Sequence, residues 1–194
     1  MRICFATHNL DKVREIKKLF SNRIEILSLK DLGITEEIEE TGSTLTENAL
    51  IKARYVLDNH NLICFADDSG LEVTELDGDP GVKSARYAGE PENKERNIDK
   101  LLFELQGSTS RQARFRTIIA LVSAKEERIF EGSIEGEIIE ERRGTNGFGY
   151  DAVFLPKNFD CTFGEMNLEE KNLISHRAKA VTKLINFLTD TNWH

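Results

Sequence analysis

The chain has 194 residues, of which 26 are Lys or Arg and 34 are Asp or Glu, and its formal net charge is −8. This length suffices for one domain with a sizeable core, and an excess of acids without a run of Lys or Arg argues against a DNA or RNA polymer as partner. No apolar run is long enough for a membrane span or a secretion signal, and the three cysteines form no C-x-x-C pair, so we expect a single cytoplasmic domain over residues 1–194 with no membrane partner.

Strand-like and helix-like segments alternate in the first half of the chain. An apolar run over 2–7 predicts a buried strand, and a turn at His8 and Asn9 separates it from a helix expected over 11–20. A second strand is expected over 24–29. Thr44 and Glu47 have the spacing of a capping box, which predicts a helix from there to about residue 59. The apolar segment that begins at Cys64 predicts the next strand.

The second half adds a hairpin to this pattern. A helix is expected over 93–105, and two strands over 111–124 and 128–139 are separated by a short turn. A glycine-rich loop over 144–149 and a last helix over 175–189 complete the chain. Because an antiparallel hairpin lies within an α/β alternation, we expect an α/β fold with a mixed central sheet and flanking helices.

Two adjacent acids, Asp67 and Asp68, follow the Cys64 strand and precede Ser69 and Gly70. Side chains alternate along an extended chain, so the two carboxylates should point to opposite sides of the strand end. Hard oxygen ligands of this kind suit Mg²⁺, which binds one or two carboxylates together with substrate phosphates. A simple turn remains open as an alternative, since Asp, Ser and Gly all favour turns.

Three cations occupy unusual places in the expected helices. Lys12 and Arg177 lie in first turns, where the helix dipole disfavours a cation unless an anion is present. Arg177 also falls within the apolar stripe of its helix, and Lys52 lies at the edge of another such stripe. Three inward-leaning cations predict a polyphosphate site. The alternative for each of them is a pair with a structural carboxylate or an extended side chain that reaches water.

Two loops carry further candidates. Glu39 and Glu40 come just before the capping box, in a polar loop where an acid is ordinarily solvated. Phe148 stands between Gly147 and Gly149, so a planar ligand ring can approach its face closely. A tight turn that packs Phe148 and Tyr150 into the core is the alternative there.

Six short motifs, taken in order, resemble the inosine triphosphate pyrophosphatases, also called XTP/dITP diphosphatases, which clear non-standard purine nucleotides. The motifs extend over nearly the whole chain, and six in one order are far more specific than any one alone. They are 6–15 (ATHNLDKVRE), 40–42 with 47–49 and 52–53 (ETG, ENA, KA), 66–71 (ADDSGL), 80–87 (PGVKSARY), 144–151 (GTNGFGYD), and 170–171 with 175–177 (EK, SHR).

The resemblance implies two lobes around a nucleotide-binding cleft and a role for each matching residue. Asp68 is implied to activate the attacking water, and Glu40 and Asp68 to hold Mg²⁺. Arg177, with His176, is implied to reach the base edge, where a guanidinium can donate to a 6-keto oxygen but faces the 6-amino group of adenine donor to donor. The remaining substrate-binding residues are implied to be Thr7, His8, Asn9, Lys12 and Ser69 for the phosphates, Lys52 and Lys171 for further positive charge, and Phe148, Gly149, Tyr150 and Asp151 around the purine.

The reaction implied is water attack on the α-phosphorus of ITP, dITP or XTP, which yields a monophosphate and pyrophosphate. A homodimer is also implied. Two alternatives stay open: a pyrophosphatase with other or broader base specificity, and a nucleotide sensor without turnover. On this reading, Arg177→Ala should affect base preference more than stability.

Overall fold

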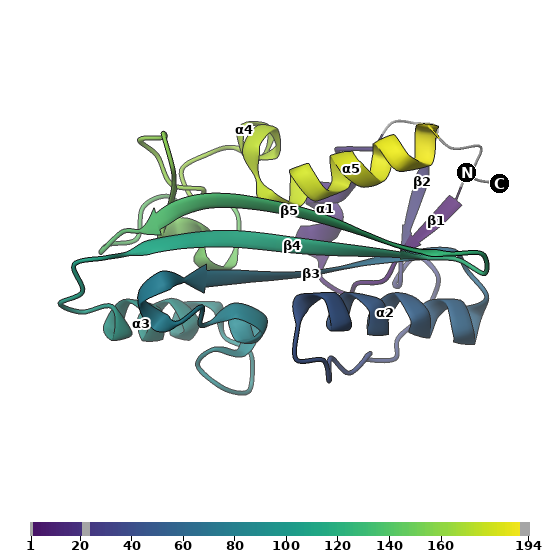
Figure 1. Ribbon diagram of the computed structural model, residues 1–194, viewed down its shortest axis with the longest axis horizontal. Coiled ribbons are helices and arrows are strands. Elements are labelled where there is room, and N and C mark those ends of the chain that lie inside the picture. The colour runs from purple at the N-terminus through teal and green to yellow at the C-terminus, as the bar shows by residue number, and fades with distance from the viewer. Residues whose placement is uncertain (1, 21–23, 191–194) are drawn as a thin grey trace. The chain divides into compact units, whose positions relative to one another are not determined.

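The computed structural model describes residues 2–20 and 24–190, and its strands form one sheet in the order β2-β1-β3-β4-β5-β6 (Figure 1). The strands are β1 (Arg2–Phe5), β2 (Glu25–Ser28), β3 (Cys64–Val73), β4 (Gln112–Val122), β5 (Glu127–Ile138) and β6 (Phe154–Pro156). The α-helices are α1 (Leu10–Lys17), α2 (Leu45–His60), α3 (Lys94–Glu104), α4 (Leu168–Ile174) and α5 (His176–Asp190), and three short 3-10 helices are η1 (Thr74–Leu76), η2 (Gly81–Arg86) and η3 (Gly149–Ala152).

The sheet is mixed, which confirms the expected fold class. Strand β1 pairs in parallel with both β2 and β3, whereas β5 and β6 are antiparallel. A four-residue turn joins β4 to β5, where the Ser123 N–H donates to the Glu126 carbonyl at 3.1 Å. Strand β6 and helix α4 were not predicted, because three and seven residues are too few to show a periodic pattern.

Strand β3 corrects one expectation. It continues from Cys64 to Val73 without a break, so both the strand end placed at the two acids and the alternative turn are wrong. Leu71 and Val73 are fully buried beyond the polar segment and extend the strand. Gly70 permits close packing there, because a Cβ at that position would lie 2.5 Å from the Gly81 carbonyl oxygen. The acids therefore lie in the middle of a strand that neighbours β1 and β4.

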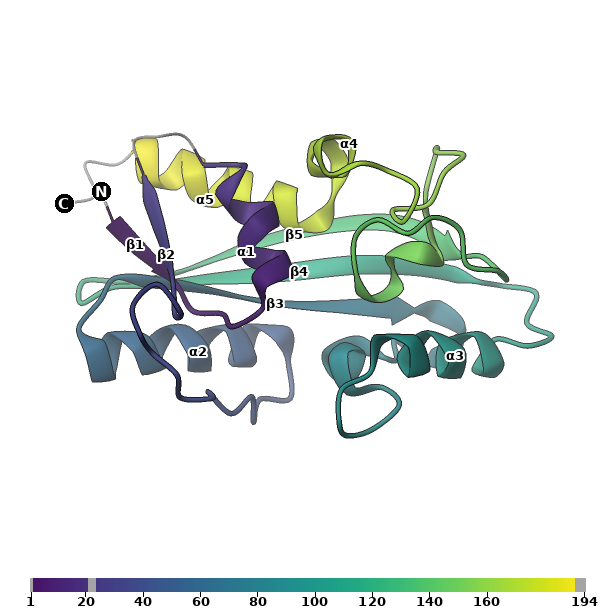
Figure 2. The same cartoon turned by 180° about the vertical axis from the view of Figure 1, so that it is seen from behind.

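The chain divides into two compact units. Strands β3, β4 and β5 each contribute residues to both units. The first comprises residues 1–68, 117–132 and 177–194. Within it, α2 lies on one side of the strands and α1 and α5 on the other (Figures 1 and 2). Its core brings together apolar side chains of β1, α1, β3 and α5, including Phe5, Ile16, Phe65 and Val181. This core fixes the starts of α1 and α5 and the acids of β3.

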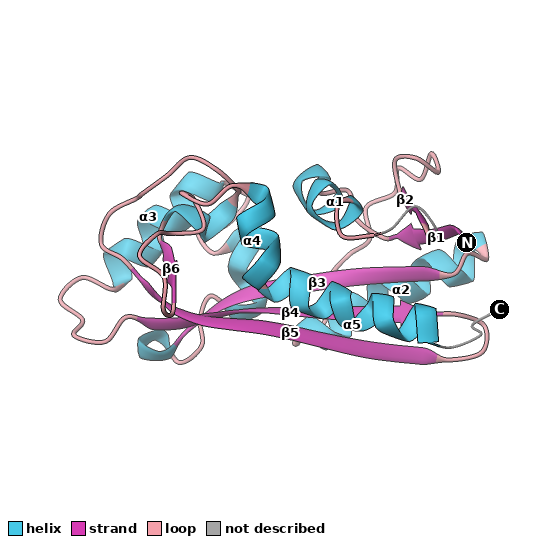
Figure 3. Cartoon of the chain, turned by 90° about the horizontal axis from the view of Figure 1, so that it is seen from above, coloured by secondary structure: helices cyan, strands magenta, loops and turns pink. Residues whose placement is uncertain are grey.

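The second unit comprises residues 69–116 and 133–176. Figure 3 shows its helices α3 and α4, its short strand β6 and its parts of the long strands. Its core includes Leu71, Leu101, Phe115 and Phe154. The expectation of a single domain stays a prediction. Within the described ranges, no helix combines the length and apolar character that a membrane span needs.

Candidate active site

The first turn of α1 is held by the segment that leaves β1. Asn9 is the N-cap, and its Oδ1 accepts hydrogen bonds from the N–H groups of Asp11 and Lys12 at 3.0 and 3.1 Å. The Asn9 N–H in turn donates to Thr7 Oγ1 at 3.1 Å. This arrangement satisfies two N–H groups that a helix start otherwise leaves unpaired, and it directs Lys12 toward β3.

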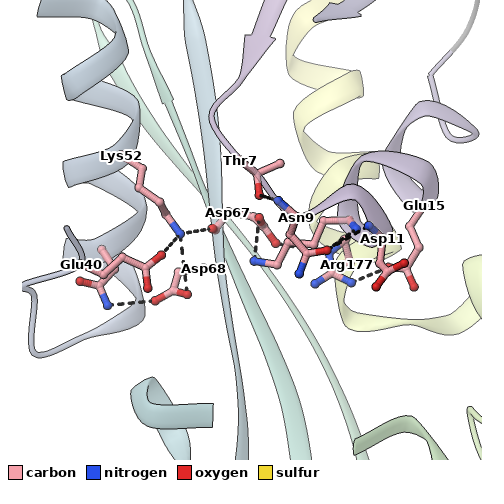
Figure 4. A network of polar contacts seen from close by, with 11 residues as sticks. Thr7, Asn9, Asp11, Glu15, Glu40, Lys52, Asp67, Asp68 and Arg177 are labelled. Carbon is pink, nitrogen blue, oxygen red and sulfur yellow. Dashed lines mark hydrogen bonds and ion pairs between the residues drawn. The ribbon is translucent and has the colours of Figure 1, made fainter. Parts of the chain in front are cut away.

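Asp67 contacts all three cations for which the sequence predicts an inward direction (Figure 4). Lys12 Nζ donates to Asp67 Oδ1 at 3.0 Å, and Arg177 Nε donates to Asp67 Oδ2 at 3.3 Å. Lys52 Nζ donates to the Asp67 backbone carbonyl at 2.7 Å. Helices α1, α2 and α5 are thereby tied to one residue of β3, which the sequence indicated only as one of two adjacent carboxylates suited to a cation.

Lys12, Arg177 and Lys52 stabilise the ionised form of Asp67. Its side chain is fully buried, and burial by itself would raise the pKa of the carboxyl. Lys12 and Arg177, with a contribution from Lys52, outweigh burial and hold the pKa of Asp67 well below its usual range. Asp67 is therefore ionised throughout the physiological range and anchors the cations around it.

Asp68 points to the opposite side of β3, as the alternation predicted. Its Oδ1 lies 3.9 Å from Lys52 Nζ, and its Oδ2 accepts a hydrogen bond from Asn48 Nδ2 at 3.2 Å. Lys52 Nζ also donates to Glu40 Oε1. One ammonium group thus lies between the two carboxylates for which the sequence predicts a metal.

The protonation of Asp68 differs from that of Asp67. Burial is the largest influence and raises the pKa of Asp68, while Lys52 and Lys12 oppose the rise and Glu40 adds to it. For Lys52, burial favours the neutral amine, but Asp68, Glu40 and Asp67 outweigh it and raise the pKa. Adjacent acids with pKa values displaced in opposite directions fit different tasks, an ionised anchor and a proton acceptor.

The donor set suits a divalent cation that completes its coordination with ligand oxygens. Within residues 2–20 and 24–190, no three His, Cys, Asp or Glu side chains form a metal cage. Glu40 and Asp68 offer hard carboxylate oxygens on either side of Lys52. The connected cluster holds three cations and four carboxylates, so a divalent ion would change its balance from negative to positive. The members are Lys12, Lys52, Arg177, Glu15, Glu40, Asp67 and Asp68.

Arg177 is directed inward, as predicted, and is 2% exposed. Its Nη1 donates to Glu15 Oε2 at 2.5 Å, in addition to the bond from Nε to Asp67. These carboxylates outweigh burial and raise the pKa of the guanidinium. The pairing matches the alternative left open from the sequence, a structural ion pair, and the role of Arg177 at a base edge stays a prediction.

A separate group of predicted residues lies in the second unit, where η3 begins. Asp151 Oδ2 accepts hydrogen bonds from the Phe148 N–H at 2.8 Å and from Lys171 Nζ at 2.7 Å. Lys171 is buried, and its Nζ lies 5.1 Å from the centre of the Phe148 ring. Asp151 therefore fixes the backbone of Phe148 and the cation beside its ring at the same time.

Other predicted residues are placed as follows. Tyr150 is buried and its hydroxyl donates to the Ser84 carbonyl at 2.9 Å, so the alternative of a core position holds for this ring. His176 stacks on Phe115 with ring centres 4.6 Å apart. His8 is exposed and its Nε2 lies 3.0 Å from the Glu36 carbonyl oxygen. Ser69 follows Asp68 within β3, and Gly149 has a positive φ of 59°.

The sequence did not indicate three contributions to this site: the ion pair of Glu15, the hydrogen bond from Asn48 to Asp68, and the anchoring role of Asp67. Glu15 is a buried carboxylate on α1, and it is paired across 162 residues with Arg177. Asn48 belongs to the motif at 47–49, and the resemblance implied no role for it. Asn48 lies one helical turn before Lys52, at the edge of the apolar stripe of its helix, and this was an available indication. Glu15 lies away from the face that Val13 and Ile16 form, so the pattern of its helix gave none.

Comparisons with known proteins match nearly the whole chain to one family. The model of the Ham1 family matches residues 3–187. A dITP/XTP pyrophosphatase of Christiangramia forsetii is 53% identical over 189 residues, which cover 97% of this chain and 100% of that protein. Another protein of this name, from Porphyromonas gingivalis, is 50% identical over 188 residues, covering 96% of this chain and 97% of its own.

Solved structures show the same similarity. The Staphylococcus aureus Ham1 protein superposes with a TM-score of 0.89 at 39% identity, covering 98% of this chain and 99% of its own. A HAM1 protein of Coxiella burnetii gives a TM-score of 0.90 at 38% identity, covering 98% and 100%. The family model spans residues 3–187, a range that contains the residues of both groups described above.

Proposed function

The chain belongs to the Ham1 family, and from this membership we infer that it is a nucleoside triphosphate pyrophosphatase that hydrolyses non-standard purine nucleotides such as dITP and XTP. The observation that carries the chemistry is the contrast between the neighbouring acids of β3. Asp67 is held ionised by cations, whereas burial raises the pKa of Asp68 against the opposing influence of Lys52 and Lys12. A general base for water needs the second environment and a fixed phosphate-binding frame needs the first.

We propose that Asp68 accepts the proton of the attacking water. The reaction joins a water oxygen to the α-phosphorus, breaks the bond to the bridging oxygen, and leaves pyrophosphate. Lys52, whose Nζ lies 3.9 Å from Asp68 Oδ1, is proposed to draw a phosphate oxygen toward Asp68. Lys12, which contacts the Asp67 carboxylate on the opposite side of β3, is proposed to bind another part of the polyphosphate. Thr7, Asn9 and Ser69 are proposed to add polar contacts to these phosphates. Catalysis then consists mainly of positioning and of neutralising charge.

Mg²⁺ is the proposed cofactor, held by Glu40 and Asp68. When bound, it would neutralise developing charge on phosphate oxygens and lower the pKa of its bound water. Lys52 lies between these carboxylates and keeps them close to each other without the ion. A cluster with more acids than bases repels a triphosphate, so the ion is also needed to make binding favourable.

Recognition of the base is proposed for the second group of residues. Phe148 offers a ring face beside the Lys171 ammonium, which favours an electron-rich base. Tyr150, Asp151 and Gly149 shape this segment. A 6-keto purine should be preferred over adenine wherever the site offers only donors, since an unmatched buried donor can cost a factor of 10⁴ or more.

A nucleotide panel tests the proposed function. Release of pyrophosphate and of inorganic phosphate should be measured separately for dITP, ITP, XTP, GTP, ATP and dTTP. We expect pyrophosphate with the monophosphate as products, and a kcat/KM for the 6-keto non-standard purines at least about 100-fold above that for ATP. Phosphate release, or equal rates on all bases, would overturn the substrate assignment.

Removal of the metal gives a second prediction. We expect EDTA to reduce turnover of dITP to background, and added Mg²⁺ to restore it. Mn²⁺ should also restore it, because the same oxygen ligands suit that ion. Ca²⁺, which is larger and takes more ligands at longer distances, serves as the control and should bind without supporting comparable turnover. Full activity in EDTA would contradict the metal proposal.

We further propose a homodimer located in the cytoplasm. The support is the resemblance to the nucleotide-pool enzymes named above and the general prevalence of symmetric dimers. Light scattering after gel filtration of the full chain would decide between a monomer and a dimer.

A further inference from the structure

Asn48, in the first turns of α2, is a fully buried amide without a task in the mechanism above. Asparagine is a weaker helix former than alanine, and a buried amide costs free energy unless its polar groups are bonded. Both halves of this amide are used. Its Nδ2 donates to Asp68 Oδ2 at 3.2 Å, and its Oδ1 accepts from the Gly42 N–H at 2.8 Å. One side chain therefore joins β3 to the loop before α2.

The loop is packed tightly against this amide. A Cβ at Gly42 would lie 2.7 Å from Asn48 Oδ1 and 2.6 Å from the Glu47 Cβ, so only glycine fits the present backbone. Gly42 follows Glu40 by two residues, and the Glu40 carboxylate contacts Lys52. The position of Glu40 relative to Asp68 thus depends on the contact between Gly42 and Asn48.

We propose that Asn48 is a positioning residue, whose amide sets the orientation of the Asp68 carboxylate and holds the Glu40 segment in register with it. The bond to Oδ2 turns Oδ1 toward Lys52, 3.9 Å away, which is the side where Glu40 lies. The inference rests on the proposed function, because that function gives Asp68 and Glu40 their tasks. It adds a residue that acts only through them.

The chemistry requires an amide at this position. Aspartate has the same shape and can still accept from Gly42, but it presents no donor and places another carboxylate against Asp68. Alanine removes both bonds. Asn48→Asp therefore tests the bond to Asp68, while Asn48→Ala tests both bonds together. Losses of 10–100-fold in activity or metal affinity are typical when a group that orients a metal ligand is removed.

The chain offers a matched control in the second unit. Asn97 is a buried amide on α3, whose Oδ1 accepts from the Ala88 N–H at 2.7 Å and whose Nδ2 donates to the Ala85 carbonyl at 2.7 Å. Like Asn48, it donates from Nδ2 and accepts at Oδ1, with a second and longer contact from Nδ2 to the Ser84 carbonyl at 3.4 Å, but these partners are all backbone groups. Asn97→Asp and Asn97→Ala thus make the same chemical change without a carboxylate of the mechanism.

The experiment compares these four variants with the parent at a temperature where circular dichroism shows each to be folded. For dITP, kcat and KM are measured at saturating Mg²⁺, and Mn²⁺ affinity is measured with and without an α,β-imido analogue that cannot be hydrolysed. We expect both Asn48 variants to lower kcat by about 10–100-fold and to weaken Mn²⁺ binding by about 10-fold or more. The KM for dITP should change less, and the Asn97 variants should lose thermal stability while keeping kcat and Mn²⁺ affinity.

Two results would overturn the proposal: unchanged kcat and Mn²⁺ affinity in folded Asn48→Asp, or equal losses in the Asn48 and Asn97 pairs, which would indicate a structural role alone. If Asn48→Ala does not fold, Asn48→Asp carries the test, because it keeps the bond to Gly42. A parent that releases no pyrophosphate from any nucleotide contradicts the proposed function instead. The Mn²⁺ measurements then still decide whether Asn48 orients the carboxylates.

Discussion

The Asp68→Asn variant is expected to lose about 10²–10⁴-fold in kcat for dITP, the range attributed to a general base. Asparagine keeps the size of the side chain and can still accept the hydrogen bond from Asn48. It cannot take a proton from water, and it offers a metal a neutral oxygen in place of a charged one. Lys52 keeps its contacts with Glu40 and the Asp67 carbonyl, so the surroundings should hold.

The same change should not cost stability. Folding raises the pKa of Asp68, so the folded metal-free protein binds a proton at this site more tightly than the unfolded chain does. Stability contributed by this site is therefore lost as pH rises from the ordinary carboxyl pKa through the raised value in the folded state. The neutral asparagine side chain does not titrate, so the variant does not lose this stability as the pH rises. At pH values above the raised pKa of Asp68, we expect the melting temperature of metal-free Asp68→Asn to equal or exceed that of the parent.

Asp58→Asn provides the control for this prediction. Asp58 is an exposed residue of α2, and its substitution removes one negative charge at the surface. The control should keep the kcat and the melting temperature of the parent. Turnover of Asp68→Asn at the parental rate would remove Asp68 from its role, and a large drop in its melting temperature would show that the carboxylate serves the fold.

Features of the fold that depend on neighbouring residues could be predicted from the sequence. The capping box of Thr44 and Glu47 is present, and α2 begins at Leu45 as expected. The alternation of Asp67 and Asp68 across β3 also holds, with Lys12 and Arg177 on one side and Asn48 and Lys52 on the other. Such features depend on residues within one turn or one strand, which a single sequence displays.

The errors and omissions come from contacts that are distant in the sequence. The continuation of β3 through its acids depends on its neighbours in the sheet and on the approach of Gly81. The turn-forming residues Asp, Ser and Gly alone therefore gave a wrong prediction of a strand end or a turn. The partners of Asp67 are 55 and 110 residues away in the chain. The position of Arg177 within the apolar stripe of its helix indicated that its side chain is directed inward, but it could not identify which carboxylates the guanidinium meets.

The Arg177→Met variant is expected to show the largest loss of stability. Arg177 is almost completely buried, and its removal takes a guanidinium away from the buried carboxylates of Glu15 and Asp67. Removing one partner of a buried ion pair typically costs about 3–5 kcal/mol. For a chain of this size we expect a fall in melting temperature of roughly 6–20 °C. This reverses the expectation from sequence, in which base preference changed more than stability.

A double-mutant cycle with Glu15→Gln separates the two possible tasks of Arg177. If the guanidinium serves mainly to compensate buried carboxylates, Glu15→Gln should restore part of the stability lost in Arg177→Met, because it removes a buried negative charge that has lost the guanidinium. Base preference, measured as the ratio of kcat/KM for ITP and ATP at a temperature where both variants are folded, should then stay within about threefold of the parent. If the ITP to ATP ratio instead collapses in Arg177→Met and in the double variant, and stability does not recover, Arg177 belongs to the base edge. The loss would then follow the missing guanidinium donor and not the charge of Glu15.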